Sequence, residues 1–165
     1  MNGVSKLGWG AFGLAAAVIV LDQAVKHWIL AILNLPQLAT VKVGGPLYLT
    51  MVWNPGVSFG FLRADQDFVR WLLVGFSVLV ALFIGNWARR AERPLSALGL
   101  GLVMGGALGN AIDRARFGAV VDFVDVSRLM FPWVFNVADS AISIGVVLLL
   151  ADSLRRERPV PPATV

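Results

Sequence analysis

The chain has 165 residues, of which 58% are hydrophobic and only 15% are charged. Soluble domains carry about 25% charged residues, and about 45–50% apolar residues even with glycine counted. This composition therefore excludes an ordinary soluble domain, and it excludes a disordered chain even more firmly. The net charge of +4 is modest and fits basic loops beside a membrane better than a nucleic-acid-binding surface. No cysteine and a single histidine are present, which excludes disulfides, thiolate chemistry and the common zinc sites. We therefore expect neither a metal ion nor another cofactor.

Four apolar stretches are each near the length of about 20 residues that a helix needs to cross a bilayer. They cover residues 8–33, 71–88, 95–112 and 134–151. These stretches predict a mainly α-helical integral membrane protein that forms one domain over residues 1–165. Two loops, at about 34–70 and 113–133, then lie on one side of the membrane. The first stretch also resembles a cleaved signal peptide, but its apolar run continues past the small residues 15–17 that would form the cleavage site.

The basic residues predict the orientation of these helices. Lysine and arginine are denser in segments 1–7, 88–94 and 152–165 than in the two loops. Because basic residues concentrate on the cytoplasmic side, we expect both termini in the cytoplasm and both loops outside. Four tryptophans fall near predicted helix ends, as an aromatic belt requires: Trp9, Trp28, Trp71 and Trp87.

The first loop differs in character from the helices. Its segment VKVGGPLYLTMVWNPGVSFGFL combines β-formers with glycines and prolines, which predicts short strands and turns at the outer surface. Within it, Asn54 and Gly56 belong to WNPGVSFG, first of all a good turn and also a place where a substrate backbone can bind. The following ADQDFVRWLL predicts a short amphipathic lead into the second helix.

The third stretch carries two patterns. Gly101, Gly105 and Gly109 recur every four residues, which predicts a face that packs closely on a neighbouring helix. A polar group follows at the outer end, where Asn110 shares a helix face with Asp113 and Arg114. This group is either a salt-bridged cap at the interface or part of a site, and the spacing leaves both interpretations open.

Ionisable residues also lie in the first and last stretches. Asp139 begins or lies inside the last stretch, with Asn136 on the same helical face. An ionisable residue at such a place is costly and is a functional candidate, although a helix N-cap is the alternative. Asp22 and Lys26, four residues apart in the first helix, predict a neutralising ion pair that braces the helix.

The available chemistry is that of carboxylates. The chain has no HExxH, GxSxG or SxxK site, whereas Asp113, Asp122, Asp125 and Asp139 all fall on the predicted outer side. Two adjacent carboxyl groups share one proton; the ionised one takes a proton from water and the protonated one polarises a carbonyl. Such a pair hydrolyses a peptide bond without a metal. Spacing alone allows either Asp122 or Asp125 as the partner of Asp139.

A small proton-coupled membrane transporter that uses intramembrane Asp and Asn is the alternative function.

Five segments, in order over roughly residues 20–150, resemble signal peptidase II, the bacterial lipoprotein signal peptidase family. They are LDQAVK, WNPGVSFG, GGALGNAIDR, GAVVDFVDV and FNVADSAISIG. The resemblance implies an intramembrane aspartic endopeptidase that removes signal peptides from prolipoproteins just before a diacylglyceryl-modified cysteine. It also implies four transmembrane helices, a small extracytoplasmic β-cradle and a short amphipathic helix at the membrane surface.

The resemblance also assigns residues and partners. It implies that Asp122, in the VVDF motif, and Asp139, in the NxAD motif, are catalytic, and it leaves Asp125 outside the pair. Residues that bind substrate or support the site are then Asp22, Lys26, Asn54, Gly56, Asn110, Asp113, Arg114 and Asn136. The implied setting is a monomer in the bacterial inner membrane, with an active site near the outer face. Its partners are prolipoprotein substrates and membrane lipid, with no nucleic acid.

Overall fold

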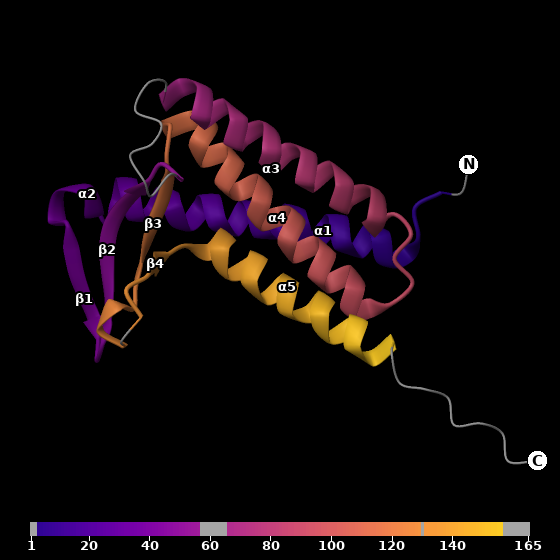
Figure 1. The fold of residues 1–165 in the computed structure, drawn as a ribbon. Helices are drawn as coiled ribbons and strands as arrows, with labels where there is room; N and C mark the ends of the chain where they lie inside the picture. Colours follow the sequence, from indigo (N-terminus) through magenta and orange to yellow (C-terminus); the bar gives the residue numbers. More distant parts are fainter. Residues whose placement is uncertain (1–2, 57–65, 130, 157–165) are drawn as a thin grey trace, which may run out of the picture.

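The computed structural model describes residues 3–56, 66–129 and 131–156. They form four long apolar helices and a small antiparallel sheet at one end of the helix bundle (Figure 1). Each of the four helices is long and apolar enough to cross a membrane. The predicted fold class, a mainly helical membrane protein with a small sheet, is therefore confirmed.

The long helices are α1 at Lys6–His27, which continues as a π-helical turn at Trp28–Ile32, α3 at Gln66–Ala88, α4 at Pro94–Phe117 and α5 at Val137–Arg156. The first helix begins, and the last one ends, at the end of the bundle opposite the sheet (Figure 1). The residues predicted as an amphipathic lead belong to α3 from Gln66 onward, so that no separate helix precedes α3 among them. Residues 64 and 65 of that segment lie outside the described part of the chain.

Two helix boundaries differ from the sequence prediction. α4 runs five residues beyond the expected end at 112, so Asp113 and Arg114 lie within a helix rather than in a loop. Gly118, whose φ of 80° is left-handed, ends the helix, and Arg70 binds the carbonyl oxygens of Arg114 and Ala115, at 2.8 and 2.6 Å. α5 begins at Val137 rather than 134 because residues 134 and 135 pair as a strand.

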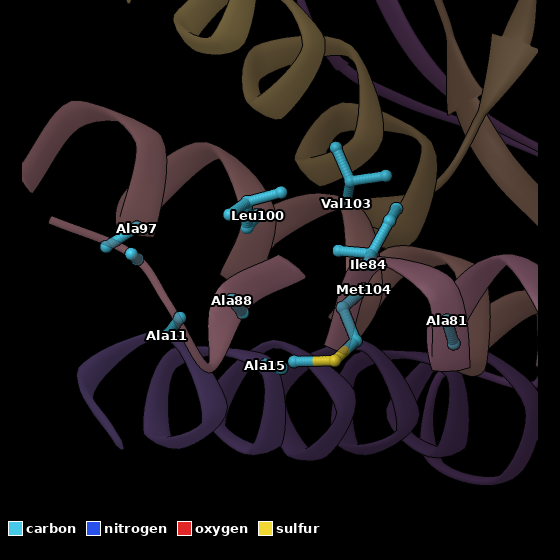
Figure 2. Close-up of a cluster of buried hydrophobic side chains, with 10 residues drawn as sticks. Ala11, Ala15, Ala81, Ile84, Ala88, Ala97, Leu100, Val103 and Met104 are labelled. Atoms are coloured by element: carbon cyan, nitrogen blue, oxygen red, sulfur yellow. The ribbon is translucent and has the colours of Figure 1, made fainter. Parts of the chain in front are cut away.

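The centre of the bundle is α4, which contacts α1, α3 and α5. The core between α1, α3 and α4 is built largely of alanines, with a few larger side chains such as Leu100 and Met104 among them (Figure 2). A Cβ atom on Gly101 would lie 2.7 Å from the Ala11 carbonyl oxygen, and one on Gly105 would lie 2.7 Å from Cβ of Val18. The predicted close-packing glycine face is therefore confirmed, and its partner is α1.

Gly101→Ala is expected to lower the stability of the folded protein by about 1–3 kcal/mol, because the added methyl group forces α1 and α4 apart. Gly13→Ala is the matched control, since a Cβ there has no atom within 4 Å. Thermal unfolding in detergent should show a lower melting temperature for Gly101→Ala alone. Equal melting temperatures for the two variants would contradict the close contact.

The sheet contains β1 at Thr40–Gly44, β2 at Leu47–Asn54, β3 at Val120–Asp125 and β4 at Val134–Phe135, in the order β1-β2-β3-β4. The strands predicted in the first loop are thus present. β3 adds a strand from the second loop, and β4 lies at the start of the stretch that was predicted as the last helix. A short helix, α2 at Leu35–Leu38, connects the first long helix to the sheet.

A second apolar cluster joins the sheet to the bundle. Ile29 and Leu35 pack there with Val121 and Phe123 of β3. Because successive side chains of a strand point to opposite faces, Asp122 between those two residues points away from this cluster. The fold therefore directs one carboxyl group of β3 toward the start of α5.

Candidate active site

Asp122 is buried, with 1% of its surface exposed. Its Oδ2 accepts a hydrogen bond from Nδ2 of Asn54 at 3.0 Å, and its Oδ1 accepts one from Nδ2 of Asn136 at 2.6 Å. Asn54 reaches Asp122 because of the register in which β2 and β3 pair. Asn54 lies opposite Val120, two residues before Asp122, so the side chains of Asn54 and Asp122 are diagonal neighbours on one face of the sheet. Burial raises the pKa of Asp122, the charge of Asp139 raises it further, and the bonds from Asn54 and Asn136 oppose this rise.

Asp139 lies in the first turn of α5, where it takes part in a reciprocal helix cap. Asn136 is the N-cap residue, and its Oδ1 accepts a bond from the Asp139 N–H at 2.9 Å. In return, Oδ2 of Asp139 accepts a bond from the Asn136 N–H at 3.4 Å. The alternative interpretation of Asp139 as a cap is thus partly right, although Asn136 holds the N-cap position itself. The other carboxylate oxygen, Oδ1, accepts a bond from Nδ2 of Asn110 at 2.7 Å.

Two asparagines connect the carboxyl groups of Asp122 and Asp139. The side-chain amide of Asn136 donates both to Asp122 and to Oδ1 of Asn110, the latter at 3.2 Å. Asn110 in turn donates to Asp139. One hydrogen-bonded network therefore holds a carboxyl group from β3 and one from α5, and fixes the orientation of both.

A buried ionic cluster of Asp22, Lys26 and Asp113 supports this network from behind. Nζ of Lys26 lies 2.8 Å from Oδ2 of Asp22 and 2.7 Å from Oδ2 of Asp113. The predicted ion pair of Asp22 and Lys26 is therefore present, and Asp113 makes it a triad. Lys26 also donates to Oδ1 of Asn110, at 3.4 Å.

The same cluster holds the backbone immediately before each carboxyl group of the pair. Oδ1 of Asp22 accepts a bond from the Ala138 N–H at 3.0 Å, and Oδ2 of Asp113 accepts one from the Val121 N–H at 3.1 Å. Val121 precedes Asp122 and Ala138 precedes Asp139 in the sequence. The triad thereby fixes the positions of β3 and α5 relative to each other.

Gln23 belongs to this cluster, although the sequence reasoning did not single it out. Its Nε2 donates to Oδ1 of Asp113 at 2.9 Å and to Oδ2 of Asp22 at 3.2 Å, and its Oε1 accepts from Arg116. Gln23 lies inside the quoted LDQAVK segment, three residues before Lys26 and so near its helical face, but its uncharged side chain gave no separate signal. Its role depends on how α4 packs against α1, and no local pattern signals that.

Arg114 and Gly56 lie together at the edge of the site. Gly56 has a φ of 84°, and a Cβ there would lie 2.7 Å from Cδ1 of Leu73 and 3.3 Å from Nη2 of Arg114. The Gly56 N–H donates to Oδ1 of Asn54 at 2.9 Å, so the predicted turn is present; residues 57–60 of WNPGVSFG lie outside the described residues. Nε of Arg114 is buried and has no hydrogen-bond partner in the described part of the chain.

The other candidate aspartate, Asp125, lies outside the network. Its Oδ2 accepts a bond from the hydroxyl of Thr50 at 2.6 Å, and its Oδ1 accepts one from the Ser127 N–H at 2.9 Å. These hydrogen bonds hold the pKa of Asp125 below its ordinary value. A separation of three residues along β3 sets Asp125 on the face opposite to Asp122.

A pocket of about 540 Å³ opens beside Asp139. Its lining comes from the β4 region and from one face of α5: Trp133, Val134, Phe135, Ser140, Ser143 and Ile144. Most of this lining is apolar, and Asp139 is the one ionisable residue among the described residues that line it. Such a pocket fits an apolar segment whose polar end meets the carboxylate.

The fold and the site together define a multi-pass membrane protein with a pair of networked carboxyl groups where its helices meet the sheet. The family model of signal peptidase (SPase) II matches residues 14–155. The chain belongs to this family and is a peptidase.

Relatives and solved structures agree with this assignment. The chain is 55% identical to a lipoprotein signal peptidase of Caulobacter vibrioides, over 93% of this chain and 92% of the relative. It is 46% identical to one of a Methylobacterium species, over 87% of each. Two solved structures, both described as bacterial membrane enzymes, superpose with TM-scores of 0.77 and 0.75 at 26% and 25% identity. They cover 94% and 97% of this chain, and 98% and 99% of their own, so the chain is a bacterial multi-pass membrane protein.

Proposed function

We propose that the protein is an aspartic endopeptidase that removes signal peptides from prolipoproteins, cutting just before the diacylglyceryl-modified cysteine. Asp122 and Asp139 are its catalytic pair. The observation that carries the proposal is the network in which Asn110 and Asn136 link these two carboxyl groups. The family supplies the class of substrate.

The catalytic cycle uses one shared proton. Asp122 holds it, since burial raises the pKa of that carboxyl group. Asp139 is less buried and, in its ionised form, takes a proton from water as the water oxygen attacks the scissile carbonyl carbon. Asp122 gives its proton to the carbonyl oxygen, which forms a tetrahedral intermediate. Asp122 recovers this proton as the carbonyl re-forms and the C–N bond breaks, and Asp139 passes its proton to the leaving amine.

The location of the pair suits a lipid-modified substrate. Asp139 begins a helix that is apolar enough to span the membrane, whereas Asp122 lies on the sheet outside the spanning segments. A lipidated cysteine can therefore remain in the bilayer while its peptide bond meets water. All side chains of the network come from one chain, so a monomer suffices.

Purified protein in detergent is expected to cleave a diacylglyceryl-modified prolipoprotein in the presence of EDTA. The unmodified precursor is the matched control and should remain uncut. Activity that EDTA abolishes and zinc restores would overturn the carboxylate mechanism. Equal cleavage of both precursors would overturn the lipid requirement.

A proton-coupled transporter is the alternative function, and the distribution of buried charge argues against it. In the described part of the chain, the buried ions gather at the two ends of the bundle. Lys26 and its two aspartates lie beside the sheet, and Asp152 accepts hydrogen bonds from Ser96 and Arg93 at the opposite end. A proton path through the membrane requires polar groups between these ends.

The pH dependence of cleavage should be bell-shaped, since the pair must carry one proton. Activity is lost at low pH when both groups are protonated, and at high pH when the shared proton leaves Asp122. Because the pKa of Asp122 is raised, the alkaline limb lies above the ordinary aspartate value of about 3.9. Asn54→Ala removes a hydrogen bond that favours the ionised form and should shift this limb to higher pH. A pH profile of kcat tests the sign, and a downward shift would contradict it.

The orientation of the bundle is also part of the proposal: the sheet faces the outside and the opposite end faces the cytoplasm. Single cysteines at Gly44 and Arg90 report on the two ends, because both positions are exposed and the chain has no native cysteine. A membrane-impermeant reagent should label only position 44 in intact cells, after permeabilisation of any outer membrane. Labelling at 90 with protection at 44 would reverse the assignment.

A further inference from the structure

A groove of about 380 Å³ runs between α1 and α3, at a distance from the active site. α1 and α3 contact each other little, while both pack on α4, so α4 forms the floor of the groove. The apolar lining includes Phe12, Val78, Leu82, Gly85, Met104 and Leu108. Met104 rises from the floor between the other two helices and extends toward Ala15 of α1 (Figure 2).

The groove ends at a single cation. Arg89 follows the last residue of α3 and lines the groove at the end of the bundle opposite the sheet. No carboxylate in residues 3–56, 66–129 and 131–156 forms an ion pair with it, whereas nearby Arg93 is paired with Asp152. The side chain of Arg89 is exposed. An unpaired cation at the end of an apolar groove is complementary to an anionic head group attached to an acyl chain.

The length of the groove corresponds to one leaflet of a membrane. Arg89 lies eleven positions after Val78, and at a helical rise of about 1.5 Å per residue this corresponds to roughly 16 Å. Half of a hydrocarbon core is about 15 Å thick. The exposed Trp9 and Trp87 lie near the same end of the bundle as Arg89, which is where tryptophan is enriched at a membrane interface.

We propose that this groove is a binding site for an anionic phospholipid of the leaflet at the end of the bundle opposite the sheet. One acyl chain lies between α1 and α3 over Met104, and the phosphate binds Arg89. The site is separate from the carboxyl pair, and the proposal does not depend on the peptidase mechanism.

Native mass spectrometry of the purified protein with added phosphatidylglycerol or phosphatidylcholine, with identical acyl chains, tests the head-group contact. The protein is expected to retain phosphatidylglycerol preferentially. Arg89→Gln should weaken this retention about fivefold, the effect of one basic residue on an anionic lipid surface, and leave phosphatidylcholine unaffected. Arg90→Gln is the matched control, because Arg90 is an exposed neighbour that does not line the groove. Equal retention of both lipids, or an equal effect of both substitutions, would overturn the proposal.

Gly85→Leu tests the acyl-chain contact independently. A Cβ on Gly85 would lie 3.5 Å from both Sδ of Met104 and Cε1 of Phe12, an ordinary contact, so the larger side chain occupies the groove. This variant should lose bound phosphatidylglycerol while Arg90→Gln keeps it. Glycerol phosphate should not displace the lipid from the native protein, since it lacks the chain. Displacement by glycerol phosphate would show a site for free phosphate and overturn the lipid assignment.

Discussion

Asp122→Asn and Asp139→Asn are each expected to reduce cleavage of the lipid-modified precursor by at least about 10²–10⁴-fold. An amide can neither hold the shared proton nor take one from water. The side-chain oxygen of asparagine can still accept hydrogen bonds, including the bond from Nδ2 of Asn136 to position 122 and the cap of α5 at position 139. Both variants should therefore remain folded, and single-turnover rates in detergent measure the loss.

Asp125→Asn is the matched control, with the same change three residues away on the opposite face of β3. Within the described part of the chain, its carboxyl group bonds to Thr50 and Ser127 and to no member of the network, so the cleavage rate of this variant should stay close to that of the native protein. Native-like turnover by Asp122→Asn, combined with an inactive Asp125→Asn, would show that the pair is wrongly assigned. Circular dichroism of each variant confirms that inactivity is not unfolding.

Lys26→Met should lower the stability of the protein by about 3–5 kcal/mol, because it leaves two buried carboxylates without their common cation. Asp22 and Asp113 both lie within 2.8 Å of the Lys26 ammonium group, and neither can move into solvent without releasing α5 or β3. Thermal unfolding in detergent should show the loss as a lower melting temperature. Activity should fall with it, since the backbone before each carboxyl group of the proposed pair is held by the same cluster.

The double variant Lys26→Met/Asp113→Asn separates loss of charge balance from loss of packing. It leaves one carboxylate, that of Asp22, in the triad, so it should be more stable than Lys26→Met alone. Lys42→Met is the control for the substitution itself, because Lys42 is exposed and should change the melting temperature little. A double variant that is less stable than the single one would show that the cluster does not act through charge.

The sequence predicts the membrane helices well because apolar content and length are local properties. The end of α4 was predicted too early, at 112, because the apolar run ends there and charged residues follow. Asp113 stays in the helix because Lys26 of α1 and the Val121 N–H of β3 satisfy its carboxylate. Both partners are far from it in the sequence, so no local pattern could reveal them.

The candidate site was predictable in composition but not in pairing. Spacing left Asp122 and Asp125 as equal candidates, and the family resemblance was needed to choose between them. The alternation of β3 sets the two on opposite faces, and the packing of Val121 and Phe123 against Ile29 determines which face meets α5. Gln23 was missed for a similar reason, because its partners on α4 meet it only after the helices have packed.

The order of the elements along the chain has a consequence for biosynthesis. Asp122 lies on β3, whereas Asp139 and its cap lie on α5, the last of the described helices. Two hydrogen bonds of the site can form only after α5 has emerged from the ribosome and packed against α1 and α4. These are the bond from the Asn136 side chain to Asp122 and the bond from the Ala138 N–H to Asp22. A partly synthesised chain therefore has no complete pair, and under the proposed mechanism proteolytic activity can appear only when membrane insertion is finished.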